Sequence, residues 1–214
     1  MSNLFWNTIS ENMKQILLDF MQTELGNRFY LAGGTALSLQ IGHRFSVDLD
    51  FFSETEDIPS IRSQLENALA KQHPQLVDSS WGNLVFLVNN VRVGFYGYGF
   101  PLVAPLIKVE QIQLASIADI GLMKLDTLLS RASRKDFYDL YFICQKMSLK
   151  SLFDKSHQKY SSIRDFETQV TKRLVFFENA EKESEPELIQ KVSWQDVKLF
   201  FIQQAKEIEK SWLQ

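Results

Sequence analysis

The sequence predicts an α+β fold, in which a mixed β-sheet with helices is followed by a C-terminal helical bundle. Two observations lead to this prediction. Up to about residue 114, short runs with the composition or alternation of strands are interspersed with helical segments. After that point, apolar residues recur at helical spacing with few interruptions. We therefore expect an α/β core over residues 1–114 and a helical region over residues 115–214.

The composition is that of a folded globular protein, with 45% hydrophobic and 23% charged residues among 214. The net charge of −3 provides no general basic field for nucleic acid, so contact with RNA needs a local basic patch. No apolar run approaches the roughly 18 residues of a membrane span. The single cysteine, Cys144, excludes an internal disulfide, and no signal peptide is visible, so we expect a cytoplasmic protein without membrane contact.

The first half contains most of the expected strands. Strands are expected at residues 29–31, 47–52, 84–88, 91–96 and 107–114. Helices are expected at residues 4–25, 35–40 and 58–72. Gly26 is a plausible C-cap for the first helix and Gly42 lies where the second one stops. Asn89 and Asn90 separate two apolar runs and predict a tight hairpin turn.

The second half reads as helical throughout. Helices are expected at residues 117–130, 134–147, 162–179 and 194–212. Ser116, Ser133 and Ser193 stand directly before three of these runs and are good N-cap residues. The acidic stretch at residues 181–187, which contains Pro186, is the best candidate for a linker.

Asp48 and Asp50 are the first candidate site. In a strand, residues i and i+2 point to the same face, so these two carboxylates would lie side by side and repel each other. A divalent cation is the usual compensation, and Mg²⁺ takes carboxylate oxygens together with phosphate oxygens. The pair predicts an Mg²⁺ (or Mn²⁺) site that bridges a nucleoside triphosphate (NTP) and an attacking oxygen. Taken alone, the same pattern also suits a solvated edge strand.

Gly33, Gly34 and Thr35 form the second candidate site, between an expected strand and an expected helix. Glycines let the backbone approach a ligand closely, and a helix N-terminus offers free N–H groups and a favourable dipole to phosphate. Thr35 is expected either to cap that helix or to donate its hydroxyl to a phosphate oxygen. A plain turn with a threonine cap is the alternative.

Taken in order, these segments resemble a known family. The residues are Gly-Gly-Thr-Ala-Leu at 33–37, His-Arg-Phe-Ser at 43–46 and Asp-Leu-Asp-Phe-Phe at 48–52. Together they resemble the AbiEii/AbiGii-type toxin family of minimal nucleotidyltransferases, within the DNA polymerase β-like superfamily. The resemblance implies a nucleotidyltransferase-like sheet in the first half of the chain.

A second block supports the resemblance. Residues 117–124 and 130–140 are similar to the later motifs of the family, with Lys124 on a helix, then Arg131, then a basic residue before Asp136. The two blocks span about residues 30–141. The helices on either side of that span carry no motif that matches.

The resemblance implies a role for each matching residue of the first block. The nucleotide-binding residues would be Gly33, Gly34 and Thr35, which would hold the β- and γ-phosphates of an NTP. Asp48 and Asp50 would be catalytic metal ligands.

The resemblance also implies roles in the second block. Lys124 would contact the triphosphate or the charge that develops on it. Arg131 would bind phosphate or RNA. Asp136 would act as a base or orient a basic partner, and could take over the base role if another acid is missing.

Each of these residues has a simpler interpretation. Lys124 is also compatible with a solvated lysine on a helix surface, and Asp136 with a first-turn acid stabilised by the helix dipole. Asp139 suits an i,i+4 pair with Lys135. His43 and Arg44 suit a surface turn, although a basic pair before an acidic strand could also balance the charge of the site.

One position departs from the superfamily pattern. Many members place a third carboxylate on a later strand, beside the first two, and here Gly94 stands where that acid is expected. Glu110, on the next expected strand, could replace it only if the geometry allows. A site with two carboxylates would bind metal more weakly.

Two functions follow from the sequence. The first is an Mg²⁺-dependent enzyme that moves a nucleoside monophosphate from an NTP to a hydroxyl of an RNA, such as tRNA, or of a protein. The resemblance makes this enzyme the toxin of a toxin–antitoxin pair, with a cognate antitoxin as partner. The alternative is a module of the same fold that binds nucleotide or a partner without transfer.

Overall fold

The computed structural model describes residues 4–212 and divides the chain into two compact units. The first unit comprises Met1–Pro101 and Pro105–Ser116, and the second comprises Leu102–Ala104 and Ile117–Gln214. The short segment Leu102–Ala104 belongs to the second unit because the Val103 N–H donates to Asp119 Oδ1 at 2.9 Å.

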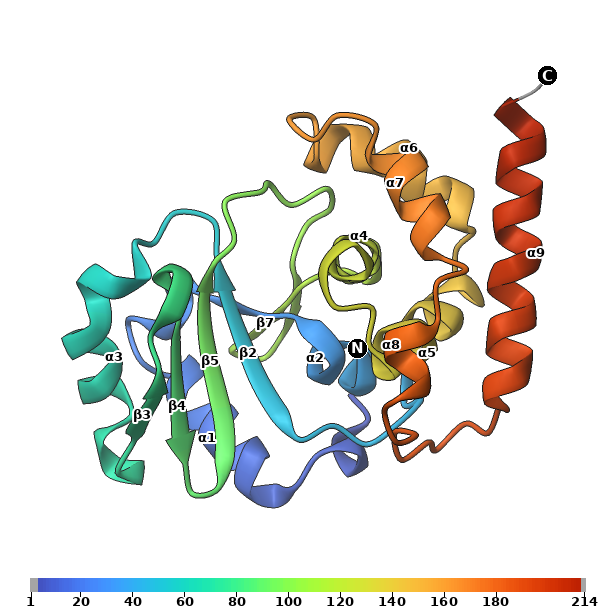
Figure 1. The fold of residues 1–214 in the computed structure, drawn as a ribbon. Coiled ribbons are helices and arrows are strands. Elements are labelled where there is room, and N and C mark those ends of the chain that lie inside the picture. Colours follow the sequence, from blue (N-terminus) through green and yellow to red (C-terminus); the bar gives the residue numbers. More distant parts are fainter. Residues whose placement is uncertain (1–3, 213–214) are drawn as a thin grey trace. The chain divides into compact units, whose positions relative to one another are not determined.

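Within the described residues, the first unit builds a seven-stranded sheet in the order β3-β4-β5-β2-β1-β7-β6. The strands are β1 (Tyr30–Leu31), β2 (Asp48–Ser53), β3 (Gln75–Asp78), β4 (Leu84–Val88), β5 (Val91–Gly97), β6 (Ile107–Val109) and β7 (Ile112–Leu114). The pairs β2/β5 and β1/β7 are parallel and the other pairs are antiparallel. This mixed sheet confirms the predicted α+β class (Figure 1).

Two strand predictions were incomplete. The strand expected at residues 107–114 is the hairpin β6–β7, because Glu110 has a left-handed φ of 54° and turns the chain back. Strand β3 was missed: most of its residues are exposed, so it lacks an alternating apolar pattern. The turn at Asn89 and Asn90 is confirmed, and both residues have positive φ, as a tight hairpin turn requires.

The helices of the first unit are α1 (Glu11–Met21), α2 (Gly33–Ile41) and α3 (Arg62–Ala68). Helix α1 begins later than predicted because Ser10 caps it, accepting from the Met13 N–H at 3.2 Å. It also ends earlier, and Gly26 starts a short 3-10 turn instead of capping it. Gly42, with φ 62°, ends α2 as predicted. The helix expected at residues 58–72 is broken into α3 and a 3-10 turn on each side.

A cluster of phenylalanines forms the core of the first unit. Phe20 on α1 contacts the rings of Phe29, Phe51 and Phe95, with centroid distances of 4.6 to 5.9 Å. Along β2 the buried positions alternate with half-buried ones, so Leu49 and Phe51 point into this core. The side chains of Asp48 and Asp50 therefore point to the opposite face of the sheet.

The second unit is helical, as predicted. Its helices are α4 (Ile117–Ser130), α5 (Arg134–Cys144), α6 (Leu149–Lys159), α7 (Phe166–Arg173), α8 (Glu178–Glu181) and α9 (Trp194–Trp212). Helix α6 was missed, and the helix expected at residues 162–179 is divided into α7 and α8. Within residues 4–212, no helix is both long and apolar enough to cross a membrane.

The acidic stretch at residues 181–187 packs against helix α5 within the second unit, so the linker prediction was wrong. The Arg134 N–H donates to Glu183 Oε2, and the Tyr138 hydroxyl donates to Glu185 Oε1, both at 3.0 Å. Helix α5 and this stretch therefore belong to the same packed body. The acidic side chains find partners on the N-terminal end of α5.

We expect Phe51→Ala to lower the thermal midpoint by roughly 10 °C, because truncating a fully buried phenylalanine costs about 3–5 kcal/mol. Val47→Ala is the matched control, since Val47 precedes the same strand and is 71% exposed. Circular dichroism during heating measures both midpoints. Equal midpoints for the two variants would contradict the assignment of Phe51 to the core.

Candidate active site

The face of β2 that points away from the core carries the carboxylate pair. Asp48 and Asp50 are half-buried and occupy alternate positions of one strand, as the sequence predicted. On the parallel neighbour β5, Arg92 is paired with Asp48 and Gly94 with Asp50. Arg92 therefore lies on the carboxylate face and adds one positive charge beside Asp48.

Gly33, at the start of α2, lies next to the carboxylate pair of β2. It opens α2 with φ 66°, a conformation that residues with a side chain rarely adopt. A Cβ atom there would lie 2.9 Å from Asp50 Oδ2. The glycine was expected to make room for a ligand, and in this structure it makes room for a carboxylate oxygen of the pair.

The start of α2 presents free donors. The N–H groups of Gly33, Gly34 and Thr35 belong to the first turn and have no acceptor within the helix. Ala36 is the first residue to bond back, to the Ala32 carbonyl at 3.4 Å. This end of the helix can attract an anion such as phosphate through its N–H groups and its dipole.

Thr35 does not cap α2, so that expectation was wrong. The N-cap position is Ala32, which has no side-chain cap bond, and Thr35 is almost completely buried. Its hydroxyl donates to the Asp48 carbonyl and lies 2.8 Å from Ser46 Oγ. Thr35 therefore ties the beginning of α2 to the beginning of β2.

The basic pair before β2 is not a surface turn. His43 is fully buried and Arg44 is 5% exposed, so the simpler interpretation of these residues was wrong. The Arg44 guanidinium donates to the Phe45 carbonyl at 2.9 Å. The chain that leads into β2 is thus held by buried polar side chains, which restricts where Asp48 can lie.

Gly94 lies where the sequence placed the missing third acid, next to Asp50 on β5. The side chain of Tyr96 fills that place. A Cβ atom at Gly94 would overlap the Tyr96 hydroxyl and would lie 2.5 Å from Cε2 and 2.6 Å from Cζ. The Tyr96 hydroxyl forms a hydrogen bond with the Asp50 carboxylate. Burial raises the pKa of Tyr96, and the charge of Asp50 and the bond to it raise it further, so the phenol stays protonated.

Glu110 does not replace the third acid. It lies at the turn between β6 and β7, and β1 separates β7 from β2 in the sheet. Among the described residues, no group of three or more His, Cys, Asp or Glu side chains is placed to hold a metal ion. Two carboxylates on one face still suit Mg²⁺, which is often bound by one or two carboxylates together with substrate phosphates.

The second unit contains a compact charged cluster on α4 and α5. Lys124 Nζ lies 2.7 Å from Asp136 Oδ1 and 2.6 Å from Asp139 Oδ2. Lys124 is 4% exposed and both acids are fully buried. The interpretation of Lys124 as a solvated lysine was therefore wrong, and Asp139 has Lys124 as a partner.

Asp136 is held on both of its oxygens. Arg131 donates from Nε to Oδ2 at 2.9 Å and from its terminal nitrogen to Oδ1 at 3.0 Å. The Ser133 hydroxyl donates to Oδ2 at 2.7 Å instead of capping α5 through the backbone. Burial alone would raise the pKa of Asp136, but Lys124 and Arg131 outweigh it and hold the pKa well below its usual range. Such a carboxylate is a weak base and is better suited to orienting Lys124 and Arg131.

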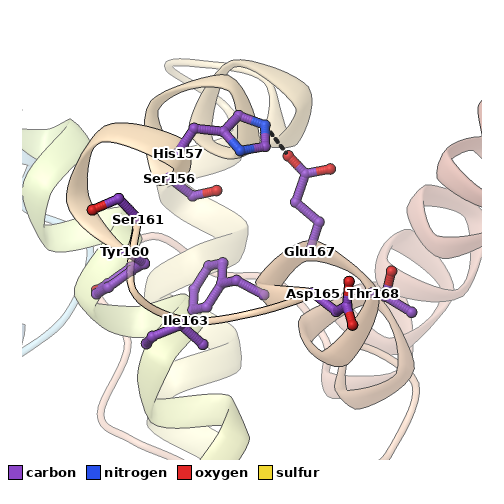
Figure 2. Close-up of a pocket in the computed structure, with 9 residues that line it drawn as sticks. Ser156, His157, Tyr160, Ser161, Ile163, Asp165, Glu167 and Thr168 are labelled. Atoms are coloured by element: carbon purple, nitrogen blue, oxygen red, sulfur yellow. Dashed lines mark ion pairs between the residues drawn. The ribbon is translucent and has the colours of Figure 1, made fainter.

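A pocket of about 410 Å³ lies elsewhere in the second unit, between α6 and α7. Figure 2 shows His157 turned toward Glu167. Its Nε2 lies 3.0 Å from Glu167 Oε1. The other lining residues are Ser156, Tyr160, Ser161, Ile163, Asp165, Phe166 and Thr168. None of the residues that the sequence motifs singled out lines this pocket.

Tyr96 and Arg92 were missed by the sequence analysis. A usable signal was present for Tyr96, because a glycine two positions before an aromatic residue in a strand leaves space that the ring can cover. For Arg92 no local signal existed. Its position beside Asp48 depends on the parallel register of β2 and β5, which local sequence does not specify.

The chain matches the family model "Nucleotidyl transferase AbiEii toxin, Type IV TA system" over residues 15–80 and 90–212. It is 34% identical over 206 residues to the uncharacterized protein aq_aa25 of Aquifex aeolicus, and the match covers 93% of this chain and 97% of that protein. These matches confirm the resemblance seen in the two motif blocks.

Solved structures of other proteins share the fold of this chain. JHP933 from Helicobacter pylori superposes with a TM-score of 0.56 at 19% identity, over 94% of this chain and 90% of that one. MenT4, the nucleotidyltransferase toxin Rv2826c from Mycobacterium tuberculosis, superposes with a TM-score of 0.50 at 16% identity, over 90% and 81%. At these identities the likeness shows the shared fold.

We expect Asp136→Asn to destabilise the protein by about 3 kcal/mol at pH 7, because it removes one carboxylate from a buried charge cluster. The folded-state pKa of Asp136 lies below the ordinary value near 4, so its stabilisation is present above about pH 4 and is lost as the pH falls below it. The difference between wild type and variant should therefore shrink from pH 4 downwards. Urea unfolding at pH 7, 5 and 3 measures it, with the exposed Asp154→Asn as control. A difference that is as large at pH 3 as at pH 7 would argue against this pairing.

Proposed function

The chain belongs to the AbiEii family of nucleotidyl transferase toxins, and from this premise we propose an Mg²⁺-dependent transfer reaction. A nucleoside monophosphate moves from an NTP to a hydroxyl of an RNA, such as tRNA, or of a protein. The acceptor oxygen forms a bond to the α-phosphorus while the bond from that phosphorus to pyrophosphate breaks, and the hydroxyl proton is released.

The carboxylate pair is the observation that supports this proposal most strongly. Asp48 and Asp50 share one face of β2, and Gly33 at the start of α2 lies against Asp50. Two adjacent carboxylates repel each other unless a cation or a donor compensates them. When bound there, Mg²⁺ (or Mn²⁺) would neutralise phosphate oxygens and orient the triphosphate.

The chain supplies the rest of the phosphate site through its backbone. The N–H groups of Gly33, Gly34 and Thr35 would donate to the β- and γ-phosphates, and the dipole of α2 would favour their charge. Thr35 would contribute indirectly as well, since its hydroxyl holds the Asp48 carbonyl and so the start of β2. Asp48 and Asp50 would be the metal ligands.

For Lys124 and Arg131 we propose a phosphate-binding role. Lys124 is buried between two carboxylates, which fix the direction of its ammonium group. The Arg131 side chain contacts Asp136 and is 55% exposed, so a phosphate in solution can approach it. Asp136 would act by positioning these two cations, in keeping with its lowered pKa.

The biological role we propose is that of a cytoplasmic toxin that a cognate antitoxin neutralises, in keeping with the family. The net charge of −3 argues against a large RNA footprint. Arg134, which is close in sequence to the basic residues Arg131 and Lys135, contacts Glu181 and the Ala180 carbonyl. An RNA acceptor would therefore be bound through a small contact, such as the 3′ end of tRNA.

The second candidate function is a module that binds nucleotide or a partner without transferring anything. Gly94 favours it, since the position next to Asp50 carries no acid. Metal-dependent labelling of any acceptor would exclude this alternative.

We expect labelled nucleotide to appear in an RNA or protein band when the protein is incubated with Mg²⁺, each α-labelled NTP and a cell-free extract. Asp48→Ala/Asp50→Ala should reduce the label to background because both metal ligands are gone. Glu54→Ala/Asp57→Ala is the matched control, since it removes two exposed acids just beyond the same strand and should label normally.

Label that persists in Asp48→Ala/Asp50→Ala would contradict the assignment of the metal ligands. No label with any NTP, from a protein that still binds NTP and Mg²⁺, would favour the binding module.

A further inference from the structure

Tyr96 occupies the position next to Asp50 that a third acid would take. Strand β5 runs parallel to β2, with Gly94 beside Asp50 and Tyr96 beside Phe52. Residues 94 and 96 point to the same face, so the tyrosine ring can fold back over the glycine. It does so closely, because a Cβ atom at Gly94 would lie 2.6 Å from Tyr96 Cζ.

The hydroxyl at the end of that ring reaches Asp50. The two groups form a hydrogen bond, and a neutral phenol can only be the donor to an ionised carboxylate. Asp50 Oδ2 also lies close to α2, since a Cβ atom at Gly33 would be 2.9 Å from it. Asp50 is therefore confined between the start of α2 and the tip of the Tyr96 side chain.

We propose that Tyr96 is a positioning residue for the metal ligand Asp50, and that the Gly94–Tyr96 pair takes the structural place of the third carboxylate. The inference rests on the proposed function, since it assumes that Asp48 and Asp50 bind a divalent cation. Tyr96 supplies a donor where an acid would supply a third negative charge. It reduces the repulsion between the two acids and fixes the direction of the Asp50 carboxylate.

A purely structural role for the ring is the competing explanation. Tyr96 stacks on Phe52 with a centroid distance of 5.0 Å and an interplanar angle of 26°. Tyr96→Phe keeps this stacking and keeps the space over Gly94 filled, and it removes only the hydroxyl. Any change in cation affinity in that variant therefore reports the hydrogen bond to Asp50.

The test is Mn²⁺ binding, followed by the electron paramagnetic resonance signal of the free ion during titration of the metal-free protein. We expect the dissociation constant of Tyr96→Phe to rise at least about tenfold, because losing a hydrogen-bond partner of a metal ligand typically costs 10- to 100-fold in affinity. Tyr98→Phe is the matched control, since it removes a hydroxyl from the next tyrosine of the chain and should bind as wild type does.

A second comparison shows whether Tyr96 acts through Asp50. Asp50→Asn weakens Mn²⁺ binding by itself, and adding Tyr96→Phe to it should change the affinity no further. If Tyr96→Phe lowered the Mn²⁺ affinity of the wild type and of Asp50→Asn by the same factor, the inference would be overturned, because Tyr96 would then act independently of Asp50. Gly94→Ala should weaken binding as Tyr96→Phe does, since its methyl group displaces the phenol.

The outcomes separate this inference from the proposed function. Unchanged Mn²⁺ affinity in Tyr96→Phe, in a protein that transfers nucleotide, overturns the inference alone. If the wild-type protein binds Mn²⁺ but transfers no nucleotide, and Tyr96→Phe binds Mn²⁺ more weakly, the transfer reaction is overturned and the inference stands. A wild-type protein that binds no Mn²⁺ overturns both.

Discussion

Repulsion between Asp48 and Asp50 is the constraint around which the first unit is organised. Alternation along β2 places both carboxylates on one face, because Leu49 and Phe51 are required in the core. The surrounding structure limits the cost of this arrangement in several ways. Gly33 removes a side chain from the space beside Asp50, while hydrogen bonds from neighbouring elements hold the strand in place. A divalent cation and a triphosphate, bound as proposed, would reduce the repulsion between the two carboxylates further.

The two units compensate their buried and half-buried charged side chains in different ways. In the first, two like charges share a face and the chain adds a neutral donor, Tyr96, with a single basic residue, Arg92, on the neighbouring strand. In the second, Lys124 and Asp136 belong to a buried cluster in which opposite charges are matched through direct contacts. Buried pairs of this kind cost desolvation energy and are better explained by the orientation that they impose than by stability.

Local sequence was sufficient for features that depend on periodicity. The alternation around Asp48 and Asp50 predicted their shared face, and the glycine after α2 predicted its end. Local sequence was insufficient where segments distant in the chain determine the contacts of a side chain. Thr35 has the composition of a cap, but its hydroxyl binds a carbonyl on β2, which no local pattern indicates. A solvated Lys124 remained an alternative at the level of sequence because its partners lie on the next helix. The sequence predicted that Gly94 stands where a third acid is expected. That the Tyr96 side chain fills this space became clear only from the structure, with β5 in register beside β2.

Thermal unfolding with and without Mn²⁺ tests whether Asp48 and Asp50 form a cation site. A cation that binds only the folded protein raises its stability by an amount that grows with concentration, about 2.7 kcal/mol at a hundred times the dissociation constant. We expect Mn²⁺ to raise the melting temperature of the wild-type protein and to leave that of Asp48→Asn/Asp50→Asn unchanged. An equal rise in both proteins, or no rise in the wild type, would show that Asp48 and Asp50 do not bind the cation.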